Sequence, residues 1–219
     1  RIILSGYRET HRREGVWANA GDVLRLSPLQ PEEAINFIQG ALARLGVDIT
    51  EHASFIARRC GFQPAILIRF GQSLLARLKT LRSPQRLGEY IAVSADDVSN
   101  TFKDAAILEE IRTVVSNNFQ GNRQGGVIFD ALLLAMQELP PGFPLENAPQ
   151  RILDKLKHNG TDTDWLSRID PNPEEEIKRH LRDFIERELL IEESGLNWGE
   201  AYRLKFPHYL PVLTQQIDL

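Results

Sequence analysis

The chain has 219 residues, enough for one or two domains, and 42% of them are hydrophobic while 26% are charged. This balance is typical of a globular protein and excludes a long disordered chain. The formal net charge of −4 excludes a uniformly basic surface, so any contact with nucleic acid would need a local patch. Cys60 is the only cysteine, which excludes an internal disulfide and favours a reducing, cytoplasmic location. No apolar run reaches the ~20 residues of a membrane span, so we expect no membrane contact.

The first 26 residues contain two short apolar stretches separated by a polar segment. Residues 1–6 (RIILSG) predict a short buried strand that ends at its glycine. Residues 23–26 (VLRL) form a second short apolar stretch, stopped by the Ser-Pro pair that follows. The chain begins with Arg1 and enters the first strand directly, so we expect that the sequence is cut just before or inside a strand.

From Pro31 the hydrophobic period becomes helical, and three helices are predicted in succession. The first begins at Pro31 and stops at Gly46. The second covers residues 51–60, with Thr50 as its N-cap and Gly61 as its stop. The third begins at Pro64 and is apolar nearly all round in its first two turns, which indicates a buried central helix. The first helix has its expected inner positions at Ala34, Phe37, Ile38, Ala41, Leu42 and Leu45.

Two further helices complete a helical domain over residues 27–118. Ser94 and Asp97 have the spacing of a capping box and predict a short helix. Another helix is expected over residues 104–117, and no strand is expected after residue 26 in this part. Residues 119–126 (FQGNRQGG) have the composition of a flexible linker and mark the domain boundary.

The second domain, residues 119–219, has a different order of elements. Helices are predicted over residues 127–138, 147–157 and 174–188, and short strands over residues 143–145, 189–191 and 201–206. Trp165, Leu166 and Ile169 are expected to anchor a loop before the last helix. Helix, strand, two helices and a closing hairpin is the order of a winged helix, in which the hairpin is the wing.

The sequence contains none of the common catalytic or metal-binding motifs. The chain has no GxxxxGK[ST] phosphate loop. Residues 127–130 (VIFD) imitate a magnesium motif, but the helical pattern around them favours an acid on an exposed helix face. The five histidines have no metal-ligand spacing, Cys60 fits a small core residue, and residues 161–164 (TDTD) lack the glycine and glutamate of a calcium loop. We therefore expect no catalytic residue, no metal site and no ATP turnover by this chain alone.

The stretch over residues 60–75 (CGFQPAILIRFGQSLL) resembles the lid motif of STAND-type ATPases in the AAA+ superfamily. In that group a glycine, two variable residues and a proline open a buried helix. Residues 24–34 resemble the strand and helix start that enter such a lid, residues 1–8 resemble the sensor-1 strand, and residues 202–206 resemble a final wing strand. The resemblance implies a mainly α fold: a remnant core strand within residues 1–26, a helical lid over 27–118 and a winged helix over 119–219.

The same resemblance implies a site for ATP or ADP. Gly61, Gln63 and Pro64 would contact adenine, and Ser5 and Arg8 would lie near the terminal phosphate. A missing N-terminal ATPase core would hold most of the nucleotide. The alternative for the first three is an ordinary turn between two helices, and for the other two a solvated loop. The implied function is a signalling switch that couples nucleotide state to a protein partner or effector.

The last helix of the second domain leaves DNA binding open as a different function. Residues 174–188 contain six acids and four bases, a difference of −2, so both signs are interleaved there. Phosphate repels such a surface about as often as it attracts it. A DNA-binding transcription regulator is therefore the alternative, and its contacts would come from Lys178, Arg179, Arg182, Arg203 and Lys205.

Overall fold

The computed structural model describes residues 28–81, 90–119, 121–169, 171–195 and 199–216. Over these residues the chain is mainly helical, as the sequence predicts. It divides into two compact units, residues 1–120 and residues 121–219, each with its own core. The strands expected within residues 1–26 lie outside the described residues.

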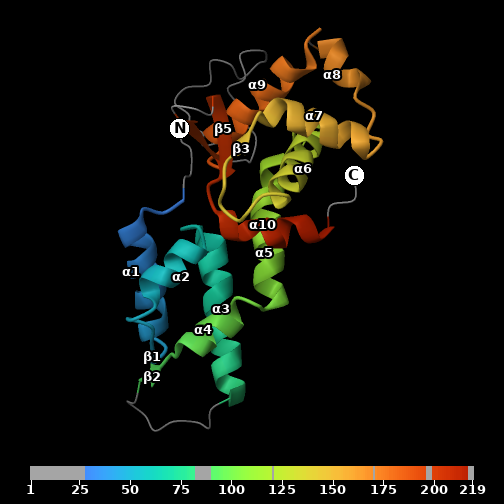
Figure 1. Cartoon of the computed structure of the whole chain (residues 1–219). Coiled ribbons are helices and arrows are strands. Elements are labelled where there is room, and N and C mark those ends of the chain that lie inside the picture. Colours follow the sequence, from blue (N-terminus) through green and yellow to red (C-terminus); the bar gives the residue numbers. More distant parts are fainter. Residues whose placement is uncertain (1–27, 82–89, 120, 170, 196–198, 217–219) are drawn as a thin grey trace, which may run out of the picture. The chain divides into compact units, whose positions relative to one another are not determined.

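Five helices form the described part of the first unit (Figure 1). They are α1 (Pro31–Ala43), α2 (Ala53–Arg59), α3 (Pro64–Leu81), α4 (Ala95–Thr101) and α5 (Ala105–Ser116), followed by the 3-10 turn η1 (Asn117–Phe119). The central helix is α3, which packs against α1, α4 and α5, while α1 also packs against α2. Gly71 of α3 faces α1, and a Cβ there would make an ordinary van der Waals contact of 3.5 Å with Ile38 Cδ1.

The helix starts follow from local hydrogen bonds. Ser94 Oγ accepts from the Asp97 amide at 3.1 Å, and the Asp97 carboxylate accepts from the Ser94 amide at 3.1 Å, which is the predicted capping box. Asp104 caps α5 in the same way by accepting from the Ala106 amide at 2.9 Å. Thr50 does not cap α2. Its amide and hydroxyl donate to the Asp48 carboxylate, and α2 begins later, after His52.

A two-residue parallel ladder joins β1 (Val47–Asp48) to β2 (Ile91–Ala92). The prediction that this unit has no strand was wrong. Strands this short have no visible period, and their pairing depends on helices that bring distant segments together. The ladder continues at its two ends through Ile91 N–H to Gly46 O at 2.8 Å and Val93 N–H to Asp48 O at 3.0 Å.

Only one of the two apolar stripes of α1 is buried. Ala34, Ile38 and Leu42 are buried, as expected, but Phe37 is 41% exposed and Leu45 is 62% exposed. Three- and four-residue steps alone do not separate adjacent stripes, and α2 and α3 cover only the first. A similar difference occurs in α3, where Ile68 is 48% exposed although its first turns were expected to be buried all round.

The second unit combines helices with a small antiparallel sheet. Its helices are α6 (Arg123–Gln137), α7 (Ala148–His158), α8 (Asp164–Ile169), α9 (Pro173–Glu186) and α10 (Leu210–Leu213), with 3-10 turns η2 (Pro207–Tyr209) and η3 (Thr214–Gln216). The strands are β3 (Leu145–Glu146), β4 (Leu190–Gly195) and β5 (Gly199–Leu204), in the order β3-β5-β4. In the register, Leu190 pairs with Leu204 and Leu145 with Tyr202.

The core of the second unit lies between α6, α7 and α9, which pack against one another. Phe129 of α6 and Phe184 of α9 meet edge to face, with ring centroids 5.3 Å apart. Leu166 is an anchor as predicted and is fully buried, but it belongs to the helix α8, and Ile169 is 45% exposed.

The stretch expected to be a flexible linker is shorter in the structure. Asn122 accepts from the Gly125 amide at 3.0 Å and caps α6, so residues 123–126 are helical. Glycine content indicated a linker here, but the N-cap bond and the apolar positions that follow stabilise a helix.

Candidate functional site

The corner between α2 and α3 begins with a C-terminal capping motif. Gly61 has a φ of +62°, and its amide donates to Arg58 O at 3.0 Å. The next amide, of Phe62, donates to Ala57 O at 3.0 Å. This pair of bonds is a Schellman motif, which requires a left-handed residue that glycine adopts without steric cost. The sequence predicted this stop at Gly61.

Phe62 is the unexpected residue of the corner. It also has a left-handed backbone, with a φ of +58°, which is uncommon for a bulky side chain. Its carbonyl accepts from the Leu29 amide at 3.0 Å, so the chain that enters α1 is fixed to the corner. A tertiary hydrogen bond thus helps to hold a conformation that the isolated sequence would disfavour.

Gln63 and Pro64 complete the corner and start α3. Gln63 O accepts from the Leu67 amide at 3.0 Å, the first bond of the helix, and Pro64 takes the first helical position. Gly61 is buried, whereas Phe62, Gln63 and Pro64 are half-buried. The three predicted contact residues are therefore adjacent at one helix start, and two of them reach the surface.

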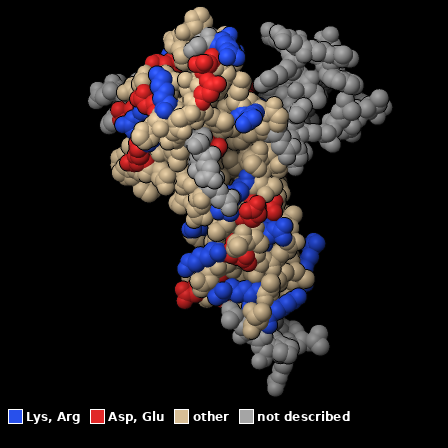
Figure 2. Space-filling view, turned by 90° about the vertical axis from the view of Figure 1, so that its right-hand side faces the viewer, with Lys and Arg blue, Asp and Glu red and all other residues tan. Residues whose placement is uncertain are grey.

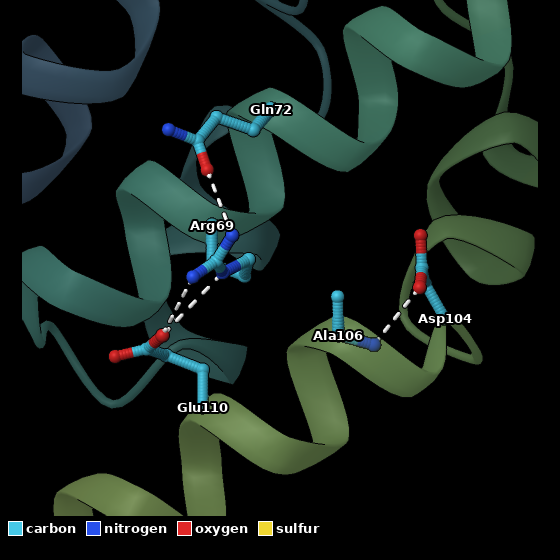
Figure 3. Close-up of polar contacts among 5 residues, drawn as sticks. All are labelled: Arg69, Gln72, Asp104, Ala106 and Glu110. Carbon is cyan, nitrogen blue, oxygen red and sulfur yellow. Dashed lines mark hydrogen bonds and ion pairs between the residues drawn. The ribbon is translucent and has the colours of Figure 1, made fainter.

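An exposed stripe on α3 begins one residue after the corner. Ala65, Ile68, Arg69 and Gln72 have helical spacing and are all exposed. Arg69 Nε lies 3.4 Å from a Glu110 carboxylate oxygen of α5, and Arg69 Nη1 donates to Gln72 at 3.2 Å (Figure 3). Sequence reasoning missed Arg69, although its position four residues after Ala65 places it on the same face. The stripe gives the corner an apolar part and a cationic part.

Two hollows in the described part of the surface lie away from the corner. One groove lies between α2 and α4, and a second cavity is lined by Leu134, Gln137, Glu138, Lys155 and Asn159. Neither includes Gly61, Gln63 or Pro64. Ser5 and Arg8, expected near the terminal phosphate, lie outside the described residues.

Most of the cations proposed for DNA binding pair with carboxylates of their own unit. Lys178 Nζ lies 2.7 Å from Glu175, Arg179 pairs with Glu176, and Lys205 Nζ lies 2.9 Å from Glu188. Arg203 pairs with Glu193 across the β4–β5 hairpin, and Arg182 is exposed. On the face drawn in Figure 2, Lys and Arg side chains are interspersed with Asp and Glu side chains.

Glu176 is a buried acid that sequence reasoning did not single out. It is 2% exposed, and besides pairing with Arg179 it lies 3.3 Å from His180 Nε2. Burial lowers the pKa of His180, while the neighbouring Glu176 carboxylate opposes that shift. Both side chains lie on the inner side of α9, with 11% of the His180 side chain and 2% of the Glu176 side chain exposed.

Two further ionisable groups, a thiol and a carboxyl, have pKa values that burial raises. Cys60 is fully buried and burial raises the pKa of its thiol, so it is the small core residue that was predicted. Asp130 is half-buried rather than exposed, and burial raises the pKa of its carboxyl to about 6. Within the described ranges, no cluster of three or more His, Cys, Asp or Glu side chains could hold a metal ion.

Comparison with known proteins adds no identification: no family model, curated protein or solved structure matches this chain. Of the helices in the described part of the chain, none has the length and apolar content of a membrane span.

Proposed function

We propose that this chain is the lid and winged-helix portion of a nucleotide-dependent switch protein of the STAND type. In such a protein an ATPase core carrying the phosphate loop holds most of the ATP or ADP. The lid closes on the adenine end of the nucleotide, and the winged helix transmits that closure to a protein partner or effector.

The observation that carries the proposal is the geometry of the corner formed by Gly61, Phe62, Gln63 and Pro64. Two consecutive left-handed residues, a tertiary bond from Leu29 and a proline at the first helical position fix its shape. An ordinary turn between two helices needs only the glycine. A corner that is restrained by all these features, and that exposes a helix start, supports a role in holding a flat ligand.

The exposed stripe on α3 supplies the two kinds of contact that a nucleotide needs. Ile68 is 48% exposed and offers an apolar surface to a base. Arg69 lies about 8 Å along the helix from Pro64, at ~1.5 Å per residue, and the guanidinium N–H groups that Glu110 and Gln72 leave over can donate to a phosphate. Glu110 and Gln72 orient the Arg69 guanidinium before any ligand arrives.

The order of elements in the second unit supports the winged-helix part of the proposal. α6, β3, α7, α8, α9, β4 and β5 follow one another along the chain, the sheet order is β3-β5-β4, and α10 comes after the β4–β5 hairpin. The ion pairs along α9 and β5 neutralise the cations that would attract DNA phosphates. A surface of paired charges favours a protein partner over DNA.

The test is nucleotide binding by the intact protein with Pro64→Ala. We expect the affinity for ATP or ADP to fall several-fold, measured by calorimetric titration. The loss of stability should stay within roughly 0.4–1 kcal/mol, because a first-turn proline mainly restrains the unfolded chain.

Pro173→Ala is the matched control, since Pro173 also opens a helix but lies in the second unit. It should change stability by a similar amount and leave nucleotide affinity unchanged. If Pro64→Ala changed neither the nucleotide affinity nor the melting temperature, the corner would be an ordinary turn between two helices. The switch proposal would then lose its main support.

A further inference from the structure

A groove between α2 and α4 forms a second surface feature of the first unit. It encloses about 290 Å³, close to the lower end of the volumes of small-ligand sites. One wall of the groove is formed by α2 and its N-cap residue His52. The opposite wall is formed by α4 and its C-cap residue Phe102. The lining residues are His52, Phe55, Arg59, Ala95, Val98, Ser99 and Phe102.

Two phenylalanine rings give the groove an apolar wall with a fixed base. Phe102 is 7% exposed, and its ring centroid lies 4.6 Å from that of Phe70, which is fully buried in α3. Phe55 meets Phe102 edge to face at 6.2 Å, yet Phe55 itself is 52% exposed. The outer ring therefore stays open to solvent while the inner ring is anchored in the core. Exposed aromatic residues beside a groove are typical of binding surfaces.

Arg59 is the charged residue that lines the groove. The Arg59 guanidinium lies over both rings, 5.0 Å from the Phe102 centroid and 5.9 Å from the Phe55 centroid. His52 is the other titratable lining residue, and no acidic residue lines the groove in the described part of the chain. The Asp97 carboxylate of α4 is 9% exposed and bonds Ser94 in the capping box.

We propose that this groove docks a segment of a partner protein in which an aromatic residue is flanked by carboxylate side chains. The aromatic ring packs against Phe55 and Phe102, where a further edge-to-face contact completes the cluster. The flanking carboxylate faces the Arg59 guanidinium, which matches it in charge, and lies beside the His52 imidazole, which can donate a hydrogen bond to it. The groove shares no lining residue with the nucleotide corner, so this inference stands independently of the proposed function.

Three short peptides test the chemistry on the intact protein by NMR titration. Acetyl-Asp-Phe-Asp-amide should bind with a dissociation constant of roughly 1 mM, which suits one buried ring and one exposed ion pair. Acetyl-Asn-Phe-Asn-amide should bind about fivefold more weakly, the loss expected for a partly exposed charge pair. Acetyl-Asp-Ala-Asp-amide should not bind measurably. Equal affinities for the first two peptides, or no binding of the first, would overturn the proposal.

Variants locate the binding in the groove. Phe55→Ala should weaken the acidic phenylalanine peptide by about tenfold or more, because it removes the open ring. Ser99→Trp, which fills the groove from an exposed position, should do the same without removing a core contact. Phe37→Ala is the matched control, since Phe37 is an exposed ring on α1 that does not line the groove. Undiminished binding in Phe55→Ala or Ser99→Trp would place the peptide elsewhere.

Arg59 variants separate charge from packing. Arg59→Gln should bring the affinity for the aspartate peptide down to that for the asparagine peptide and leave the latter unchanged. Arg59→Lys keeps the charge and should keep the preference for aspartate even where the packing on Phe102 changes. A preference that survives Arg59→Gln, or is lost in Arg59→Lys, would contradict the charge match.

Discussion

At Gly61 the backbone has a φ of +62°, a conformation that costs a residue with a Cβ roughly 1–2 kcal/mol. Gly40, inside α1, has no atom within 4 Å of an added Cβ and lies in an ordinary helix. The two glycines should therefore respond in opposite ways. Gly61→Ala should lower the free energy of unfolding by roughly 1–2 kcal/mol, and Gly40→Ala should raise it by roughly 0.5–1 kcal/mol. Urea unfolding of both variants measures this, and equal signs would contradict the capping role of Gly61.

Asp130 gives the protein a predictable dependence on pH. Burial raises the pKa of its carboxyl from 3.8 to about 6. In the unfolded chain the carboxyl releases its proton at lower pH than in the folded chain, so the folded state is disfavoured once the unfolded state ionises. The contribution of Asp130 to the free energy of unfolding is constant below about pH 4, falls between about pH 4 and 6, and is constant again above.

Asp130→Asn removes this titration. We expect the variant to have a free energy of unfolding roughly 1–2 kcal/mol above that of the unmodified protein at pH 7, after allowance for solvent screening. At pH 4 the two proteins should differ much less, which serves as the internal control. Chemical denaturation across this range measures the difference, and a constant offset at all pH values would show that Asp130 does not titrate in this window.

Residue-level prediction from the sequence succeeds where the residue itself restricts the backbone. Gly61 and Pro64 mark the two sides of the corner because glycine permits a left-handed φ and proline cannot continue a helix from within. Phe62 could not be predicted, since its φ of +58° accompanies a bond from Leu29, far away in the sequence. The orientation of Arg69 likewise depends on Glu110 of another helix.

The ion pairs of α9 and β5 lead to a prediction at the scale of the element. Non-specific DNA binding should be weak, with a dissociation constant of ~10⁻⁴ M or weaker at physiological salt. Removing two paired acids with Glu175→Gln and Glu193→Gln releases Lys178 and Arg203 from their carboxylates. The double variant should bind DNA several-fold more tightly, with a steeper dependence on salt, in fluorescence anisotropy.

The matched control replaces Glu174 and Glu186 by glutamine. This changes the net charge by the same amount, with both changes on α9 instead of one on α9 and one on β4, but neither acid forms an ion pair with a described cation. It should strengthen DNA binding less than the first double variant does. Tight binding by the unmodified protein, abolished by Arg179→Glu with Arg182→Glu, would instead support the transcription-regulator alternative.

Whole helices were predictable where an apolar period and a terminal signal occur together. α5 and α7 begin and end within a residue or two of the expected bounds, although only Asp104 caps its helix and Asn147, with a left-handed backbone, makes no side-chain cap bond. The buried face of α1 was only partly predictable, since the sequence does not say whether α2 and α3 cover Phe37 or Ile38. The four-residue α10 has too few positions to show a period at all.

At the scale of the whole molecule, the two units should fold independently, because each has its own buried residues. A fragment of residues 121–219 has the Phe129–Phe184 contact and the complete β3-β5-β4 sheet within it. We expect residues 1–120 and 121–219, prepared separately, to give far-ultraviolet circular dichroism spectra that sum to the spectrum of the joined chain. Each fragment should unfold cooperatively, and a fragment without a cooperative transition would show that its core needs the other unit.

The short ladder between β1 and β2 has a consequence for hydrogen exchange. Its amides, those of Ile91 and Val93, donate to the backbone carbonyls of Gly46 and Asp48, whereas α2 and α3 fill the chain between the two strands. Two paired residues cannot hold such a long loop closed unaided, so the ladder persists only while those helices keep its ends together. Deuterium therefore reaches these two amides through opening of the helical core, and their exchange rates report the stability of that core.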